Sequence, residues 1–148
     1  IMTPYLILDD QTMSSLCYAA KRGVDVRIMF PHIPDKPYAF WLGRTYYKEL
    51  ISNGVRIFEY TPGFVHAKEF ICDGRKAVIG SINLDFRSLY LHFENAAYLY
   101  EVPAIKDMEE DFLSSLKDCV EIDMEAIAEM PGLQMFIGSA LKIFAPLF

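Results

Sequence analysis

The stretch VHAKEFICDGRKAVIGSIN, residues 65–83, carries the strongest signal in this sequence. Its apolar residues predict two strands, at 64–72 and 76–81, joined by a short turn. Because side chains alternate along a strand, His66 and Lys68 are expected on the same face. An imidazole and an ammonium group are costly to bury among apolar neighbours unless they have polar partners or a chemical task. The pattern therefore points to a functional site.

The second predicted strand ends in small polar residues, Ser81 and Asn83. An antiparallel return after the turn Asp73-Gly74-Arg75 could bring both of them close to His66 and Lys68. The site would then combine a nucleophile or acid, a fixed cation and neutral hydrogen-bond donors. That set suits a phosphoryl group.

Elsewhere along the chain, predicted strands and helices alternate. The patterns predict strands at residues 4–8, 24–30, 55–60 and 94–100, and helices at 9–23, 38–54 and 104–119. This alternation predicts an α/β fold, with a mixed, mostly parallel β-sheet flanked by helices on both faces. We expect one domain over residues 1–122, followed by an amphipathic helical tail over residues 123–148.

Composition and charge argue against several classes of function. The formal net charge of −6 argues against nucleic acid as a partner, because neutralising phosphates needs a basic surface. No His, Cys and carboxylate cluster has metal-ligand spacing, so we predict no catalytic metal and no cofactor. No apolar run of about 18 residues is present, which predicts no membrane span.

Three further features carry weaker signals. His32 and His92 are best explained as ordinary polar loop residues. Aromatic residues such as Trp41 could line an acyl or headgroup pocket, or pack helix 38–54 into the core. The tail could dock on the body of the protein or lie in a membrane interface.

The spacing of residues 66–83 resembles the signature HxKxxxxDxxxxxxGSxN of the phospholipase D superfamily. Six residues match it: His66, Lys68, Asp73, Gly80, Ser81 and Asn83. The flanks GVDVRIMFP and GSINLDFRSLYLHFENAAYLY look like the C-terminal half of bacterial cardiolipin synthases. The resemblance covers nearly the whole chain and is weakest over the last thirty or so residues.

The resemblance implies a phosphatidyltransferase that makes cardiolipin from two phosphatidylglycerol molecules and releases glycerol. His66 would be one of two histidines that work through a phosphohistidine intermediate. It further implies that Lys68 and Asn83 hold phosphate oxygens, that Ser81 supports them, and that Glu94 hydrogen-bonds the catalytic imidazole. Asp73 completes the signature. Because it lies at the far end of the strand from His66, we interpret it as ordering the turn.

This sequence has one copy of a motif that such enzymes carry twice. We therefore expect half of an active site, inactive alone, which is completed by a missing N-terminal half or by a second copy of the chain. The implied setting is the cytoplasmic face of the bacterial cytoplasmic membrane. Two alternatives remain: a homodimeric single-motif phosphodiesterase, either a phospholipase or a nuclease, and an inactive lipid-binding module.

Overall fold

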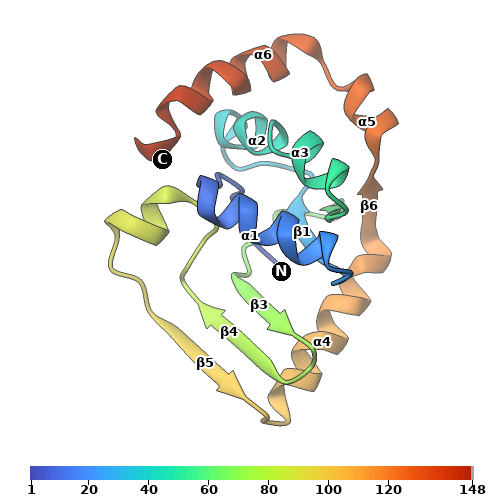
Figure 1. Cartoon of the computed structure of the whole chain (residues 1–148), viewed down its shortest axis with the longest axis vertical. Coiled ribbons are helices and arrows are strands. Elements are labelled where there is room, and N and C mark those ends of the chain that lie inside the picture. The colour runs from blue at the N-terminus through green and yellow to red at the C-terminus, as the bar shows by residue number, and fades with distance from the viewer. Residues whose placement is uncertain (148) are drawn as a thin grey trace.

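The structure is a computed structural model, and it describes residues 1–147. Six strands lie within this range: β1 (Arg27–Pro31), β2 (Arg56–Tyr60), β3 (Glu69–Cys72), β4 (Lys76–Gly80), β5 (Ala96–Tyr100) and β6 (Cys119–Ile122). The α-helices are α1 (Asp10–Lys21), α2 (Pro37–Arg44), α3 (Tyr47–Ser52), α4 (Ala104–Ser115), α5 (Met124–Glu129) and α6 (Gly132–Leu141). A π-helix, η1 (Arg87–Leu91), and two 3₁₀ helices, η2 (Leu116–Asp118) and η3 (Lys142–Leu147), complete the fold (Figure 1).

The strands form two three-stranded sheets, in the orders β1-β2-β6 and β3-β4-β5. The extended N-terminal segment connects them, because Met2 pairs in parallel with Met29 of β1 and antiparallel with Glu69 of β3. Residues 4–8 were predicted to be a strand. They form no strand, since the chain bends at Pro4 and Leu6 pairs with Leu84 through an isolated bridge.

The sheets are not mostly parallel, which corrects the prediction. Among the named strands only β1 and β2 pair in parallel. The pairs β2–β6, β3–β4 and β4–β5 are antiparallel. The β3–β4 turn is too short for a crossover, so it enforces a hairpin. Strand β6, which was not predicted, follows α4. It pairs antiparallel with β2 and forms one edge of the β1-β2-β6 sheet.

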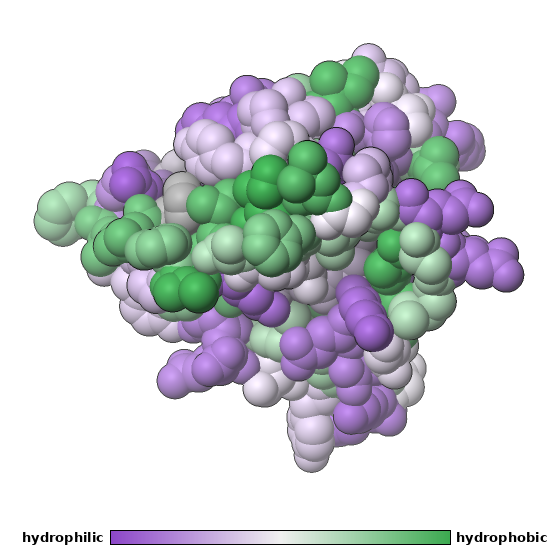
Figure 2. Space-filling model, turned by 90° about the horizontal axis from the view of Figure 1, so that it is seen from above, coloured by the Kyte–Doolittle hydropathy of each residue, from purple (hydrophilic) through white to green (hydrophobic). Residues whose placement is uncertain are grey.

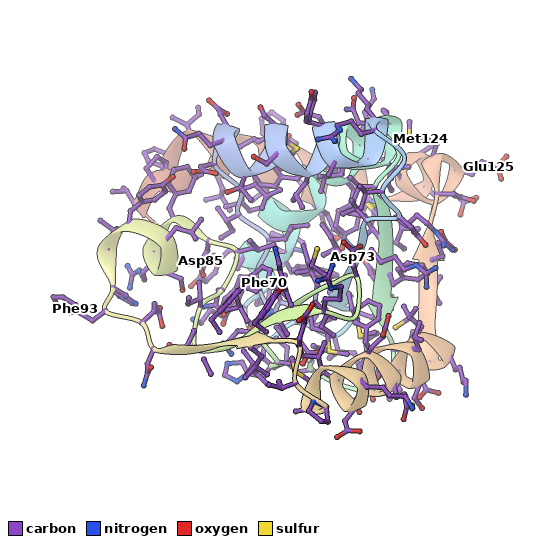
Figure 3. All side chains as sticks on the ribbon, turned by 60° about the horizontal axis from the view of Figure 1, so that its bottom comes forward. Phe70, Asp73, Asp85, Phe93, Met124 and Glu125 are labelled. Carbon is purple, nitrogen blue, oxygen red and sulfur yellow. The ribbon has the colours of Figure 1, made fainter. Side chains whose placement is uncertain are left out.

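Helices cover both faces, as predicted. On one face, α1, α2 and α3 bury Cys17, Phe40 and Tyr47 against Ile28 and Phe30 of β1, among other residues. On the other face, Phe112 of α4 packs with Met2 and Met29. Figure 3 shows α1 and α4 on opposite sides of the strands.

The first helix begins and ends where its sequence indicates. The Asp9 side chain accepts a hydrogen bond from the Thr12 amide at 2.7 Å, which caps the N-terminus. Beyond the C-terminus, Gly23 adopts a positive φ of 92°, a conformation that glycine takes without steric cost. The predicted helix 38–54 is instead two helices, because the chain turns at Thr45 and Tyr46 between α2 and α3.

The tail docks on the body of the protein through α6. Gly138 packs so closely on α2 that an added Cβ would lie 2.4 Å from the Trp41 carbonyl oxygen. The Lys142 ammonium lies 4.1 Å from the centroid of the Tyr46 ring. Trp41 is half-buried against the core, where Phe40 and Tyr47 are buried, so these aromatics have a packing role. The boundary at residue 122 remains a prediction.

Some side chains of the tail stay exposed. Figure 2 views the α6 side of the molecule, where hydrophobic residues form a band between hydrophilic ones. The large exposed apolar residues of α6 and η3 are Leu133, Phe136, Ile143, Phe144 and Leu147. None of the helices within residues 1–147 is long and apolar enough to cross a bilayer.

Candidate active site

The β3–β4 hairpin joins the two ends of the motif. Its ladder runs from Cys72 opposite Lys76, next to the turn, to Glu69 opposite Ile79. One step further, the Gly80 amide donates to the Lys68 carbonyl at 3.2 Å. The predicted antiparallel return is therefore present, and it puts Lys68 beside the Gly-Ser pair.

The predicted strand 64–72 is shorter than expected. Only residues 69–72 are in β3, and Val65–Lys68 is irregular. The physical reason is the partner strand, because β4 ends at Gly80 and leaves the residues before Lys68 with no opposite strand. His66 is consequently exposed, and its ring lies 5.7 Å from that of Phe64.

Gly80 is required by a close approach of β5. A Cβ on Gly80 would lie 2.2 Å from the Asn95 carbonyl oxygen, well inside contact distance. Because the two segments lie so close, the next residue, Ser81, forms hydrogen bonds with Asn95. Its amide donates to the Asn95 carbonyl at 2.9 Å, and the Asn95 amide donates to the Ser81 Oγ at 2.9 Å. The glycine thus lets the serine hydroxyl reach the loop before β5.

Glu94 is the carboxylate of this cluster. The Ser81 hydroxyl donates to it, and His92 Nδ1 lies 4.0 Å from the carboxylate. Hydrogen bonds from Ser81 and Ser88, together with the charges of His92 and Lys68, hold the pKa of Glu94 below its ordinary value. These contacts thus favour the ionised form of Glu94.

Lys68 supplies the cation. Its ammonium donates to the His66 carbonyl at 2.6 Å, which folds the side chain back over the irregular segment. Partial burial lowers the pKa of Lys68, against the opposing charges of Glu94 and Asp85. Lys68 and Glu94 therefore form one electrostatic cluster with Asp85, a buried carboxylate that the sequence analysis did not single out.

Two further motif residues, Asn83 and Asp73, have different surroundings. The Asn83 Oδ1 is buried without a hydrogen-bond partner. An unpaired buried oxygen typically costs about 1–3 kcal/mol, so a ligand donor there would relieve a real penalty. Asp73 occupies the turn, with φ of 54°. Figure 3 shows Asp73 and Asp85 on opposite sides of Phe70.

No hydrogen bond joins His66 to Glu94 within residues 1–147. The carboxylate is engaged by Ser81 and lies near His92 instead. The pairing of His66 with Glu94 therefore remains a prediction. Among the same residues, no group of three or more His, Cys, Asp or Glu side chains is arranged to hold a metal ion.

A second polar network was missed by the sequence analysis. The fully buried Glu59 of β2 contacts His32 and Arg44, each at 2.7 Å, and accepts from the Tyr47 hydroxyl at 3.0 Å. One signal could have revealed it: Glu59 follows Ile57 by two residues in a buried strand, which places a carboxylate at an inward position.

Two solved structures share this fold. A phospholipase D family member, Nuc from Salmonella typhimurium, superposes with a TM-score of 0.69 and 21% identity, over 82% of this chain and 78% of that one. The phosphatidylserine synthase of Haemophilus influenzae also reaches 0.69, with 19% identity, over 99% of this chain and 39% of that one.

Sequence comparison is more specific. Residues 1–116 match the family described as "Cardiolipin synthase, PLD-like domain". The chain therefore belongs to this family of PLD-like (phospholipase D-like) domains.

Full-length relatives agree with this assignment. Over 147 residues, the chain is 48% identical to an uncharacterized protein of Streptococcus mutans, 40% to a cardiolipin synthase of a Geobacillus species and 39% to cardiolipin synthase 2 of Bacillus anthracis. It spans 29–32% of the length of these relatives, and 99% of its own.

Proposed function

We propose that this chain supplies one half of the active site of a phosphatidyltransferase that makes cardiolipin from two phosphatidylglycerol molecules. The observation that carries the proposal is the pairing of Lys68 with Gly80 across the hairpin, which groups a cation, a hydroxyl and a carboxylate beside the exposed His66. We infer phospholipids as the substrate class of these residues, because the chain belongs to the cardiolipin synthase family.

The reaction has two steps, shared between His66 and the histidine that pairs with it. A ring nitrogen of one of the two attacks phosphorus of the first phosphatidylglycerol, forming an N–P bond as the P–O bond to glycerol breaks. The other histidine protonates the departing glycerol oxygen. It then takes the proton of a hydroxyl on the second phosphatidylglycerol, whose oxygen attacks phosphorus as the N–P bond breaks.

The remaining motif residues have supporting roles. Lys68 and Asn83 hold the phosphate oxygens, where the cation and the amide donor offset developing charge. Ser81 and Glu94 position this part of the site and balance its charge. Asp73 orders the hairpin turn, at the end of β3 away from Lys68.

The second histidine has to come from elsewhere. In-line displacement needs attack on one side of phosphorus and protonation on the other, and one imidazole cannot occupy both sides. The partner is an N-terminal half of the same enzyme or a second copy of this chain. The N-terminal half is favoured because this chain covers only about a third of the length of its relatives.

One observation favours the alternative of a homodimeric single-motif phosphodiesterase. The chain covers 78% of the Salmonella Nuc chain with a TM-score of 0.69, so it resembles most of that chain rather than a half of it. In this alternative, a second copy would supply the second His66 and Lys68.

We further propose that the protein works at a membrane, on the cytoplasmic face of the bacterial cytoplasmic membrane. Phosphatidylglycerol resides in a bilayer, so the site must approach one. The exposed apolar residues Phe136, Ile143 and Phe144 support such an approach, because apolar side chains at a surface favour an interfacial position.

Light scattering combined with a glycerol-release assay on phosphatidylglycerol micelles tests the proposal. The monomeric chain should release almost no glycerol, since each missing charge-stabilising donor typically costs on the order of 10²–10³ in rate. Adding the N-terminal half of a relative should restore turnover, whereas adding that half to a His66→Asn chain should not. A clearly monomeric chain that turns over lipid at enzymatic rates would refute the half-site proposal.

A further inference from the structure

Strand β5 has the composition of a buried strand but is exposed on both faces. All residues of Ala96–Tyr100 are apolar or aromatic, yet only Leu99 is partly buried. By contrast, four of the five residues of β1 and three of the five of β2 are buried. Within residues 1–147, β5 pairs only with β4, so its outer edge is free (Figure 1). An apolar edge strand of this kind needs cover, which this part of the chain does not supply.

The exposed surface continues from β5 back into the loop and the helix η1 before it. We call residues 89–100 the β5 surface. Leu91 and Tyr98 are exposed, and the side chain of Phe93 is fully exposed, at 108%. Figure 3 shows Phe93 directed away from the body of the protein. A continuous exposed apolar surface on a folded domain marks an interaction site.

Hydrogen bonds on both sides of Phe93 hold the β5 surface in place. The Tyr90 hydroxyl donates to the Asp9 carboxylate, which attaches η1 to the start of α1. Beyond Phe93, the Asn95 amide donates to the Ser81 Oγ at 2.9 Å, which attaches the loop to the end of β4. A side chain presented on an ordered segment loses less conformational entropy when it binds a partner.

Phe93 is adjacent to the candidate site. The next residue is Glu94, which accepts a hydrogen bond from Ser81, and neighbouring Cα atoms are about 3.8 Å apart. In the proposed reaction, a second histidine must reach a phosphorus held at Lys68, and reacting atoms in such complexes lie roughly 3–3.5 Å apart. The protein surface that carries this histidine therefore has to cover the cluster, and it comes within reach of Phe93.

The composition of the β5 surface favours a protein partner over a lipid surface. Residues 89–100 include four aromatic residues, and their one Asp, Glu, Lys or Arg residue is Glu94. Enrichment in Tyr and Phe with few charges is typical of the core of a protein interface. Segments that bind anionic lipid typically carry Lys or Arg on their polar face, and the β5 surface has neither.

We propose that the β5 surface is the docking site for the N-terminal half of the same enzyme, with Phe93 as the side chain that inserts into it. The inference rests on the proposed function and assigns the contact surface that this function requires. Two observations favour the N-terminal half over a second copy. Two copies would each bring a net charge of −6 to the contact. About two thirds of each relative also lies outside the part that matches this chain, which is enough for a second domain.

Binding of this chain to the N-terminal half of a relative, measured without lipid, tests the proposal. Phe93→Ala should weaken binding about thirtyfold, as expected for a central aromatic residue of an interface. Tyr18→Ala removes an exposed aromatic residue of α1 and should leave the affinity unchanged. If Phe93→Ala binds like the parent while the N-terminal half still restores glycerol release, the surface is overturned and the proposed function stands. If that half neither binds the parent nor restores release, both fail.

Two measurements on this chain alone distinguish the other occupants. Phe93→Ala and the parent should cosediment equally with phosphatidylglycerol vesicles. A loss of vesicle binding in Phe93→Ala would assign the surface to lipid and overturn the proposal. Light scattering should show both chains as monomers. A dimer that Phe93→Ala dissociates would assign the surface to a second copy and would also overturn the proposal.

Amide hydrogen exchange decides the question if the N-terminal half does not fold alone. The amides of residues 96–100 should exchange more slowly in the complete two-half enzyme, in detergent without phospholipid, than in this chain. The slower exchange is expected because the partner half excludes water from β5. Equal exchange in the two proteins would show that β5 stays uncovered, and would overturn the proposal.

Discussion

The Ser81 hydroxyl donates to the Glu94 carboxylate while it accepts a hydrogen bond from the Asn95 amide at 2.9 Å. This places one serine between the backbone of the loop before β5 and the Glu94 carboxylate. The hydroxyl thereby fixes Glu94 relative to the hairpin. It is also the largest cause of the lowered pKa of Glu94.

Replacing Ser81 should therefore raise the pKa of Glu94. In Ser81→Ala the carboxylate loses its strongest hydrogen bond, and ¹³C-carboxyl NMR titration should show Glu94 moving toward the ordinary glutamate value. Ser88→Ala should give a smaller change in the same direction, because Ser88 is the second cause. Ser114→Ala, an exposed serine on α4, serves as the control. An unchanged Glu94 titration in Ser81→Ala would contradict this account.

The lowered pKa of Glu94 also makes the free energy of unfolding depend on pH. A carboxylate whose pKa is lower in the folded state stabilises the fold at pH values above its unfolded pKa. That stabilisation is lost as the pH falls through the folded pKa. Urea unfolding should thus give the Ser81→Ala chain a lower free energy of unfolding than the parent at neutral pH. The difference should become smaller at acidic pH.

Local patterns predicted the parts of this fold that depend on local chemistry. The Asp73-Gly74-Arg75 turn forms between β3 and β4, and Asp9 and Gly23 bound α1 as their types indicate. The motif residues Lys68 and Ser81 converge because one tight hairpin connects them. These features need only neighbours within about twenty residues.

Features that depend on distant contacts were not predictable in this way. The four-residue strand β6 exists because Ile122 pairs with Ile57, far away in sequence. The prediction of a mostly parallel sheet was wrong for the same reason. The direction of pairing depends on which strands become neighbours, and the composition of one strand does not determine it. The contact of His32 with Glu59 joins residues 27 positions apart, so the loop sequence around His32 did not indicate it.

Removing one donor to the buried Glu59 should cost measurable stability. Tyr47→Phe keeps the ring that packs in the core but deletes the hydroxyl that donates to Glu59. A hydrogen bond to a charged group is worth about 1.5–3 kcal/mol, and urea denaturation should show a loss in that range. Arg56→Gln breaks the exposed pair with Glu121 and should cost at most about 1 kcal/mol. The reverse order of the two losses would count against the network.

Docking of the tail should depend on Gly138. In Gly138→Ala the new methyl group meets the Trp41 carbonyl, and overpacking of this kind costs about 1–3 kcal/mol. Emission of Trp41, the single tryptophan, should shift to the red as α6 moves away, and the tail should become sensitive to protease. Gly132→Ala faces open space at the start of the same helix and should leave both signals unchanged. Identical behaviour of the two variants would show that α6 does not need this close approach.

Replacing His66 should separate chemistry from folding. His66 is exposed and makes no side-chain hydrogen bond within residues 1–147, so His66→Asn should leave the melting temperature nearly unchanged. In the complete two-half enzyme the same variant should abolish glycerol release, because residues that act as one catalytic unit fail together when one is removed. Phosphohistidine trapped from labelled phosphatidylglycerol should disappear with it. His92→Asn is the matched comparison, since His92 is also exposed but lies outside the motif, and its chain should still form the intermediate. Turnover of His66→Asn within a few-fold of the parent would remove His66 from the reaction.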